Sequence, residues 1–220
     1  MSKRNLLFVF LFFAVLAFGC RFGGHGVRGN GHVVKESRHV AKFDKIDVSG
    51  VFTVVVEVGG EGDLVVSAEE NLMKYIRTTV KKNKLIIDTK KNISPKKQLT
   101  VYVKTKELSK MEASGATDIE IEGLDEESFK LEISGAAECD ISGRVGKFVA
   151  EVSGAGNVYG RDLICDFAEL DISGAGDIKL TVNEGLNADV SGAASVIYYG
   201  DPKEVNIDTS GAASVKKKSR

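Results

Sequence analysis

The stretch Ser153-Gly154-Ala155-Gly156-Asn157 contains a phrase, Ser-Gly-Ala, that occurs six times in the 220-residue chain. The copies begin at Ser114, Ser134, Ser153, Ser173, Ser191 and Ser210, so that successive steps are 20, 19, 20, 18 and 19 residues. A near-constant period of this size is typical of stacked repeat architectures. The repeat therefore decides the fold class.

Apolar and polar residues alternate around each phrase. The third position before each serine is held by Met111, Leu131, Ala150, Leu170, Ala188 and Ile207, and the fifth position after it by Ile119, Cys139, Val158, Ile178, Val196 and Val215. An alternation with a period of two indicates strands rather than helices. A unit of this length cannot bury its apolar face alone, so we expect successive units to stack strand on strand.

These patterns predict an all-β fold, a single-stranded right-handed β-helix (solenoid) with coils of about 19 residues. The hand follows from the strong preference of parallel crossovers for right-handed connections. A second buried ladder is expected from Phe129, Phe148, Phe167, Leu186 and Val205. Phe167 lies one place early relative to its following serine, which predicts a bulge in that coil.

Residues 1–20 have the pattern of a lipoprotein signal peptide. Lys3 and Arg4 precede a continuous apolar run of 13 residues from Leu6 to Phe18, which suits a signal sequence better than a membrane span. The run ends in Leu16-Ala17-Phe18-Gly19-Cys20, which resembles a bacterial lipobox. We expect cleavage before Cys20 and lipidation of Cys20, which would anchor the protein in the membrane. The alternative is ordinary secretion with an unmodified cysteine.

Residues 21–40 are rich in glycine and lack periodicity, which predicts a flexible tether. The three histidines of the chain, His25, His32 and His39, lie here. Because no cysteine or acidic residue stands at ligand spacing, we interpret them as solvated rather than as a metal site.

Residues 41–110 are expected to be an irregular, β-rich start that closes the solenoid, since terminal repeats are atypical. Ser49-Gly50 resembles a degenerate copy of the phrase. Strands are predicted near Leu64–Ser67, Ile76–Lys81, Leu85–Thr89 and Leu99–Lys104, with one helical turn at Glu69–Lys74.

Residues 111–220 are expected to form the regular coils with a basic tail. Lys216, Lys217 and Lys218 would deter pairing at the open end. Binding of this tail to anionic lipid or polysaccharide is an alternative. Cys139 falls in an apolar column and is expected to be a small core residue, whereas a disulfide between Cys139 and Cys165 stays open.

A column of carboxylates is the main candidate site. Two residues before each serine stand Glu112, Glu132, Glu151, Asp171, Asp189 and Asp208, with Asp47 at the matching place before Ser49. Stacked like charges repel, so the column needs solvation, a compensating cation or a binding partner. With a second polar column at Asp118, Glu138, Asn157 and Asp177, it could offer oxygen ligands to Ca²⁺, although we predict no metal site and no obligatory cofactor.

We expect no catalysis from the column of serines. No histidine lies within the predicted coils, so no Ser-His pair can form there. Acid catalysis on a carbohydrate by paired carboxylates is a less favoured alternative, because these acids follow the repeat instead of interrupting it.

The chain resembles a known bacterial family. The motifs Phe43 to Gly50, Leu85-Ile86-Ile87, and the repeated Ser-Gly-Ala-Gly-Asn/Asp phrase are similar to those of the putative auto-transporter adhesin, head GIN domain family. The resemblance spans roughly residues 38–215. It implies a β-helical envelope domain of Bacteroidetes-type bacteria, and it supplies no catalytic or binding residues.

Together these observations predict a non-enzymatic, lipid-anchored cell-envelope protein, outer-membrane in location, whose solenoid wall binds a glycan or another envelope protein. A self-associating structural module, and hence a homo-oligomer, is the alternative. The formal net charge of -1 gives no indication of nucleic-acid binding.

Overall fold

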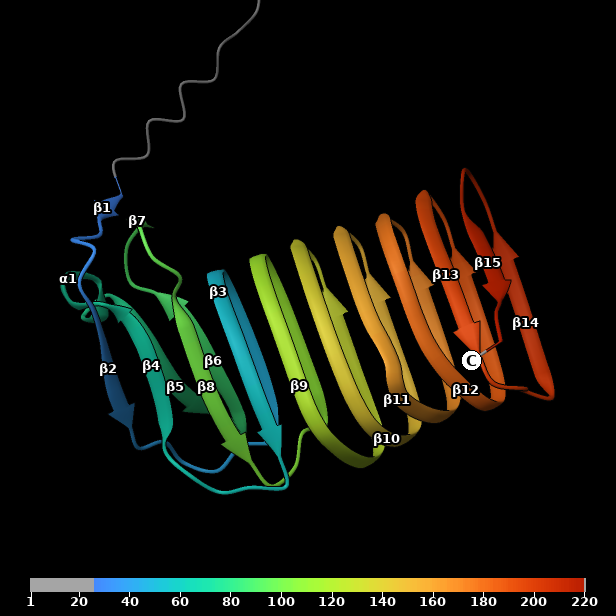
Figure 1. Cartoon of the computed structure of the whole chain (residues 1–220), viewed down its shortest axis with the longest axis horizontal. Coiled ribbons are helices and arrows are strands. Elements are labelled where there is room, and N and C mark those ends of the chain that lie inside the picture. The colour runs from blue at the N-terminus through green and yellow to red at the C-terminus, as the bar shows by residue number, and fades with distance from the viewer. Residues whose placement is uncertain (1–25, 220) are drawn as a thin grey trace, which may run out of the picture.

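The computed structural model describes residues 26–219 and is nearly all β. The strands are stacked one after another along the long axis of the molecule, from β3 to β15 (Figure 1). The main sheet has the strand order β15-β13-β12-β11-β10-β9-β3-β8-β4-β2. The predicted β-solenoid-like architecture is thus confirmed. The signal peptide and Cys20 lie outside the described residues.

The regular part consists of parallel strands, of which the longest run through most of a coil, whereas the short strands near the C-terminus share one. The parallel strands are β3 (Lys45–Val58), β9 (Lys110–Ile133), β10 (Ala136–Val152), β11 (Ala155–Ile172), β12 (Ala175–Val190), β13 (Ala193–Tyr199), β14 (Glu204–Thr209) and β15 (Ser214–Lys217). Pairing aligns the alanines of the phrase, because Ala136 pairs with both Ala116 and Ala155. Ser49 pairs with Ser114, so the degenerate copy is in register with the others.

The glycine of the phrase is required by the close stacking of the coils. A Cβ atom on Gly154 would lie 2.0 Å from the carbonyl oxygen of Gly135, and one on Gly174 would lie 1.9 Å from that of Gly154. Contacts this short with backbone atoms are not tolerated, so any side chain here would force neighbouring coils apart. The repeated glycine therefore sets how closely the coils approach each other at this corner.

The second buried ladder differs from the prediction at one rung. Phe129 and Phe148 stack with ring centroids 6.2 Å apart, but Phe148 pairs with Ala168, and Phe167 is 45% exposed. The register of β10 and β11 shifts after Asp140, because β11 carries an extra residue before Leu163. That insertion confirms an irregularity in this coil and turns Phe167 to the outside face. Leu186 continues the ladder inside, while Val205 is 39% exposed.

The N-terminal part is built from shorter strands and one helical turn. It contains β2 (Val33–Arg38), β4 (Leu64–Glu69), α1 (Glu70–Met73), β5 (Ile76–Lys81), β6 (Lys84–Thr89) and β8 (Thr100–Thr105), close to the predicted elements. Lys82 and Asn83 join β5 to β6 with positive φ angles of 50° and 60°, as a tight hairpin requires. Within residues 26–219 no helix is long and apolar enough to cross a membrane.

The described part of the expected tether, residues 26–40, is folded, so that prediction was wrong there. β1 (Val27–Arg28) pairs with β7 (Ile93–Ser94), and β2 pairs with β4. Gly29 serves close packing, since a Cβ atom on it would lie 2.0 Å from Oε2 of the buried Glu69. Gly31 instead has a positive φ of 86°, with no atom near the position of a Cβ.

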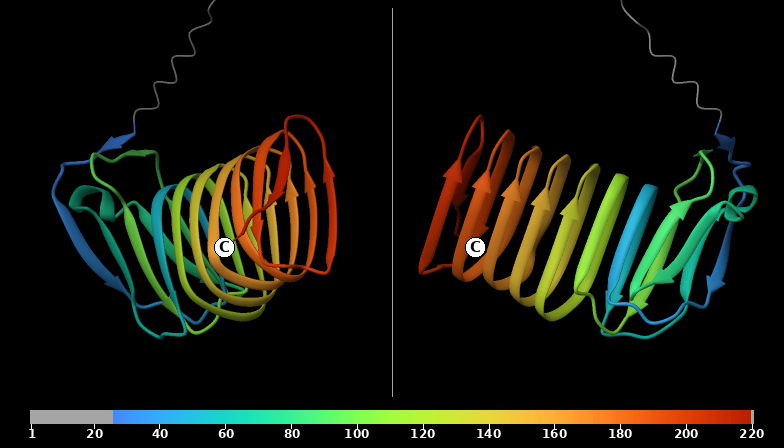
Figure 2. Two further views of the ribbon diagram at one scale, coloured as in Figure 1. Left: turned by 45° about the vertical axis from the view of Figure 1, so that its right-hand side comes forward. Right: turned by 180° about the vertical axis from the view of Figure 1, so that it is seen from behind.

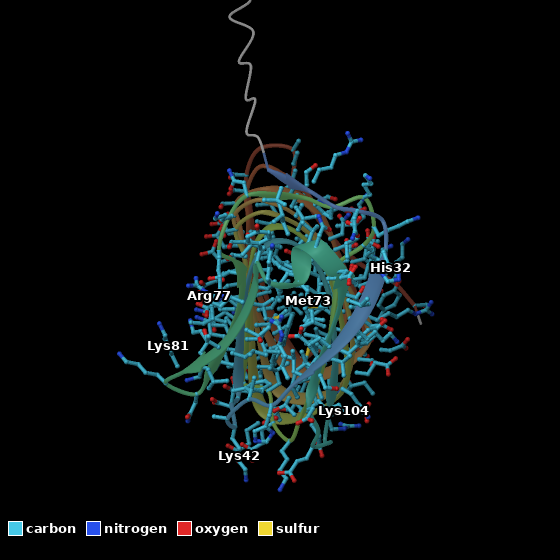
Figure 3. The ribbon with its side chains drawn as sticks, turned by 90° about the vertical axis from the view of Figure 1, so that its left-hand side faces the viewer. His32, Lys42, Met73, Arg77, Lys81 and Lys104 are labelled. Atoms are coloured by element: carbon cyan, nitrogen blue, oxygen red, sulfur yellow. The ribbon has the colours of Figure 1, made fainter. Side chains whose placement is uncertain are left out.

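The two ends of the stack differ. At the N-terminal end, the side chains of Leu72 and Met73 from α1 are buried, and Figure 3 shows Met73 inside this end while Lys81 projects away from it. At the C-terminal end, every residue of β14 is exposed, including Ile207 at 43%. Figure 2 shows this strand as the outermost element of its end.

The two described cysteines lie inside the solenoid as free thiols. Burial is the main reason that the pKa of each thiol is raised to about 12. Cys139 stands in the core ladder between Ile119 and Val158, as predicted. The disulfide that the sequence left open is not formed.

Candidate functional site

A shallow groove runs along one corner of the solenoid, where the strands approach the Ser-Gly-Ala phrases. It has a volume of about 420 Å³. We call it the acidic groove, lined by Asp47, Glu112, Ala113, Ser114, Glu132, Ile133, Ser134, Glu151, Val152, Ser153, Asp171 and Ser173. Its five carboxylates lie on successive coils and span roughly 19 Å at about 4.8 Å per coil.

Strand pairing determines the spacing of these carboxylates. Glu151 pairs with Glu132 on one side and with Asp171 on the other. Asp189 continues the series from Asp171, and Asp208 continues it from Asp189. The structure thus places the predicted residues in one column, although Asp189 and Asp208 lie beyond the groove lining.

Lysines interleave with the carboxylates at the N-terminal end of the groove. Lys84 contacts both Glu112 and Asp47. The Nζ atom of Lys110 lies 3.1 Å from Glu112 and 2.8 Å from Glu132, and that of Lys130 lies 2.8 Å from Glu132 and 2.7 Å from Glu151. We call this run of bridges the lysine ladder. It offsets the repulsion between stacked carboxylates.

The lysine ladder changes the titration of its members. Partial burial raises the pKa of Glu132, but the hydrogen bonds from Lys110 and Lys130 outweigh that effect and lower it to about 2. Burial lowers the pKa of Lys110, whereas its bonds to Glu132 and Glu112 raise it above the ordinary value. Burial and the nearby Glu112 raise the pKa of Asp47. The most strongly bridged carboxylate therefore stays ionised far into the acid range.

The C-terminal half of the column has no such compensation. In the described part of the chain, no ion pair involves Asp171, Asp189 or Asp208. The position two residues earlier, which holds Lys110 and Lys130 in the ladder, is occupied here by Glu169, Asn187 and Asn206. These carboxylates therefore keep their charge available to an external partner.

In the described chain, no histidine lies beside the serines of the phrase, and Ser191 makes a structural contact. The Ser191 hydroxyl donates to the backbone carbonyl of Ile172 at 3.3 Å. The two described histidines lie elsewhere, with His32 3.4 Å from Glu70 and His39 3.1 Å from Asp63. The arrangement can therefore accept hydrogen bonds and attract cations, but it contains no Ser-His pair.

The second polar column also keeps its register. Glu138 pairs with Asp118 and Asn157, and the Asn157 side-chain oxygen accepts a hydrogen bond of 3.0 Å from the backbone of Asp177. Between residues 26 and 219, no group of three or more His, Cys, Asp and Glu side chains is placed to hold a metal ion. The Ca²⁺ interpretation stays an untested prediction.

The lysine ladder is the part of the site that the sequence reasoning missed. Its signal was present, because Lys110 and Lys130 occupy the same place in successive units, two residues before a column carboxylate. Lys84 could not be found in this way, since it comes from the irregular part and reaches the groove only through the pairing of β6 with β3.

The family model described as "Putative auto-transporter adhesin, head GIN domain" matches residues 42–202. The chain belongs to this family. An adhesin family implies a location outside the cytoplasm. No curated protein matches the chain.

Two solved structures share the fold of this family member. One is a putative adhesin from Bacteroides fragilis, 21% identical, with a TM-score of 0.70, covering 87% of this chain and 100% of that one. The other is a putative adhesin from Parabacteroides merdae, 17% identical, with a TM-score of 0.53, covering 87% of this chain and 98% of that one. Both support the fold alone.

Proposed function

We propose that this protein is a non-enzymatic binding module of the cell envelope, anchored in the outer membrane by lipid on Cys20. In this proposal the chain is a right-handed β-helix with coils of about 19 residues, and its acidic groove holds an extended partner. The proposal rests on the C-terminal half of the carboxylate column, Asp171, Asp189 and Asp208. These residues continue the acidic groove and have no ion pair with a lysine in the described chain. A self-contained structural surface would be expected to carry the lysine ladder throughout.

The chemistry of the groove suits a partner rich in hydrogen-bond donors or positive charge. A column of carboxylates and a column of serines run side by side along it, so a glycan bearing hydroxyl or amino groups could bond on several coils at once. An extended basic segment of an envelope protein would fit the same chemistry. Ladders of like residues suit extended ligands, because each coil repeats the same contact.

A groove variant with a matched control tests the binding role. The chain from residue 21 onwards would be applied to a glycan array and to a panel of isolated envelope proteins. Replacing Asp171 and Asp189 by Asn should lower binding at least about tenfold, since each contact to a charged group contributes about 1.5–3 kcal/mol. Asp140→Asn together with Asp125→Asn removes two exposed charges outside the groove lining and should leave binding unchanged. Equal loss in both double variants would contradict a groove site.

The lipid anchor has its own test. In the native host, Cys20→Ala should shift the protein from the membrane fraction to the soluble fraction of the envelope. A membrane fraction that retains this variant at the wild-type level would oppose lipid anchoring through Cys20.

Self-association is a second candidate that one observation favours. At the open end, Val205 and Ile207 belong to apolar ladder positions and are 39% and 43% exposed. A second copy could cover them. Light scattering after size exclusion would then show a dimer that Ile207→Lys converts to monomer, whereas a wild-type monomer would leave this candidate without support.

A further inference from the structure

The net charge near zero conceals a separation of charge along the solenoid. Residues 26–110 contain 17 Lys and Arg against 10 Asp and Glu, whereas residues 111–220 contain 10 against 21. Within the first part, the excess lies in residues 70–110, with 12 basic and three acidic residues. Asymmetry of this kind indicates that the two parts face different surroundings.

A group of basic side chains gathers where the described chain begins. Strand β1 pairs with β7, and the backbone of Lys90 donates to the carbonyl of Tyr75 at 2.8 Å, which ties β1, β7 and the segment after α1 together. Figure 1 shows these elements together at the N-terminal end. We call their exposed cations the basic exit patch, consisting of Arg28, Lys74, Lys90, Lys91, Lys96 and Lys97.

The side chains of the basic exit patch are not paired with carboxylates. Among residues 26–219, none of its six side chains takes part in an ion pair. By contrast, Lys84, Lys104 and Lys106 on the same part of the fold each contact a carboxylate. The patch therefore brings together six cations that no described carboxylate pairs with.

The carboxylate of Glu69, near the patch, is buried and is bonded to backbone amides. Glu69 is fully buried, and its carboxylate accepts hydrogen bonds from the backbone of Gly31 at 2.5 Å, Lys96 at 2.8 Å and Lys97 at 3.4 Å. It fixes the loop that carries two of the patch lysines. These hydrogen bonds hold the backbone of Lys96 and Lys97 in place, so this part of the patch is ordered without a bound partner.

An aromatic ring lies within the patch. The Nζ atoms of Lys74 and Lys91 lie 5.2 Å and 5.7 Å from the centroid of Tyr75. Tyrosine combines an apolar ring with a polar hydroxyl, and it is enriched at membrane–water interfaces. A tyrosine set between two lysines fits a surface made of phosphate headgroups above acyl chains.

The chain upstream leads from this patch to the predicted lipid site. Gly26 directly precedes β1, and Cys20 lies six residues before Gly26, a distance of at most about 21 Å for a fully extended chain. Resting on the proposed lipid anchor, we propose that the basic exit patch docks on anionic phospholipid headgroups of the anchoring membrane. The N-terminal end then faces the membrane, and the acidic groove extends away from it.

Vesicle binding by unlipidated protein tests this docking without the anchor. The chain from residue 21 onwards is used, because among residues 26–219 the buried apolar side chains lie between Ile46 and Tyr199. We expect sedimentation with vesicles of phosphatidylcholine and phosphatidylglycerol but not with phosphatidylcholine alone. Binding should weaken strongly between about 50 mM and 300 mM salt, as screening of charge requires.

Two variants with the same loss of charge locate the binding surface. Replacing Lys90, Lys91 and Lys97 by Gln should weaken binding about 100-fold, at roughly fivefold per lysine near an anionic surface. Replacing Lys216, Lys217 and Lys218 by Gln should change it less than about threefold, because these lysines lie at the other end. Unchanged melting temperatures would show that both variants fold.

The outcomes separate this inference from the anchor. Equal binding to charged and uncharged vesicles, or equal losses in the two triple variants, would overturn it. So would a salt-sensitive oligomer that does not bind vesicles, because the patch would then be occupied by the acidic groove of a second copy. Failure of Cys20→Ala to leave the membrane fraction concerns the anchor alone, since the vesicle measurement uses no lipid on Cys20.

Discussion

The two ends of the solenoid are covered to different degrees. Both must terminate a stack of strands whose edges and interior are exposed. The N-terminal end is covered by β2, by α1 and by the buried carboxylate of Glu69, whereas the C-terminal end finishes with β14, of which every residue is exposed. The comparison shows that elements outside the repeat cover the N-terminal end, whereas the last coil of the repeat leaves the C-terminal end exposed.

A change in the stacking glycine should have the largest effect and should depend on its distance from the open end. Gly154→Ala places a Cβ atom 2.0 Å from a backbone oxygen in the middle of the stack, and we expect it to lower the free energy of unfolding by more than about 3 kcal/mol. Gly211→Ala meets its neighbour at 2.9 Å in the last coil, which can yield, so a loss of about 1 kcal/mol is expected.

Urea denaturation of both glycine variants measures this difference. Gly62→Ala serves as a control, because its Cβ atom would make an ordinary 3.4 Å contact with Lys104. Equal losses at positions 154 and 211 would mean that the last coil is as firmly held as the middle ones.

Truncating an apolar side chain at each end should reveal more directly how much each end contributes to stability. Leu72→Ala empties a fully buried position in α1 and should cost about 3 kcal/mol. Ile207→Ala removes a side chain that is already 43% exposed and should cost less than about 0.5 kcal/mol. Melting temperatures at several protein concentrations would show whether Ile207 is instead buried by a second copy.

The buried Glu69 makes the closed end sensitive to acid. Its hydrogen bonds from three backbone amides outweigh the opposing effect of burial and lower its pKa below 4.5. A carboxylate with a lowered folded-state pKa contributes stability above its unfolded value, and that contribution is lost as the pH falls through the folded value. Glu69→Gln should cost about 2 kcal/mol at pH 7.

Hydrogen exchange of the backbone amides provides the measurement for Glu69. Protection at Gly31 and Lys96 should fall in Glu69→Gln and, in the wild type, on acidification below pH 4.5. Amides of β12, remote from this carboxylate, should keep their protection. Loss of protection at both sites together would indicate global unfolding instead.

The smallest expected effect distinguishes the two halves of the carboxylate column. Glu132→Gln removes the carboxylate shared by Lys110 and Lys130 and should cost about 0.5–1 kcal/mol at neutral pH. Asp189→Asn removes an uncompensated charge and should be neutral or stabilising by a few tenths of a kcal/mol.

Salt and pH sharpen this difference between the halves. High salt should reduce both effects, and the penalty for Glu132→Gln should vanish as the pH falls from 4.5 towards 2, where the wild-type carboxylate is itself protonated. A penalty at position 189 equal to that at position 132 would contradict the division of the column.

The repeat made the architecture predictable, and the failures have local causes. The period around Ser-Gly-Ala predicted parallel stacking and the interior place of Cys139, because each coil repeats the contacts of the last. It misplaced Phe167, since an extra residue upstream changes which face a side chain occupies. It also missed the folded state of residues 26–40, which depends on Glu69, a partner far away in the chain.

The sequence predicted the carboxylates of the candidate site, but it did not predict the lysines that pair with them. Identical spacing placed the carboxylates in one column. Their neutralisation depends on Lys110 and Lys130, which follow the repeat, and on Lys84, which belongs to the irregular part and carries no repeat signal. The separation of charge between the two parts could have been counted from the sequence, but the overall net charge of -1 hid it.

The glycine contacts at each phrase have a consequence for how such a protein can change in length. Because a coil touches only the coil before and after it, duplication of one unit would lengthen the rod by about 4.8 Å and leave both termini as they were. Relatives with more or fewer units could then have a longer or shorter groove, with no change in the closing elements.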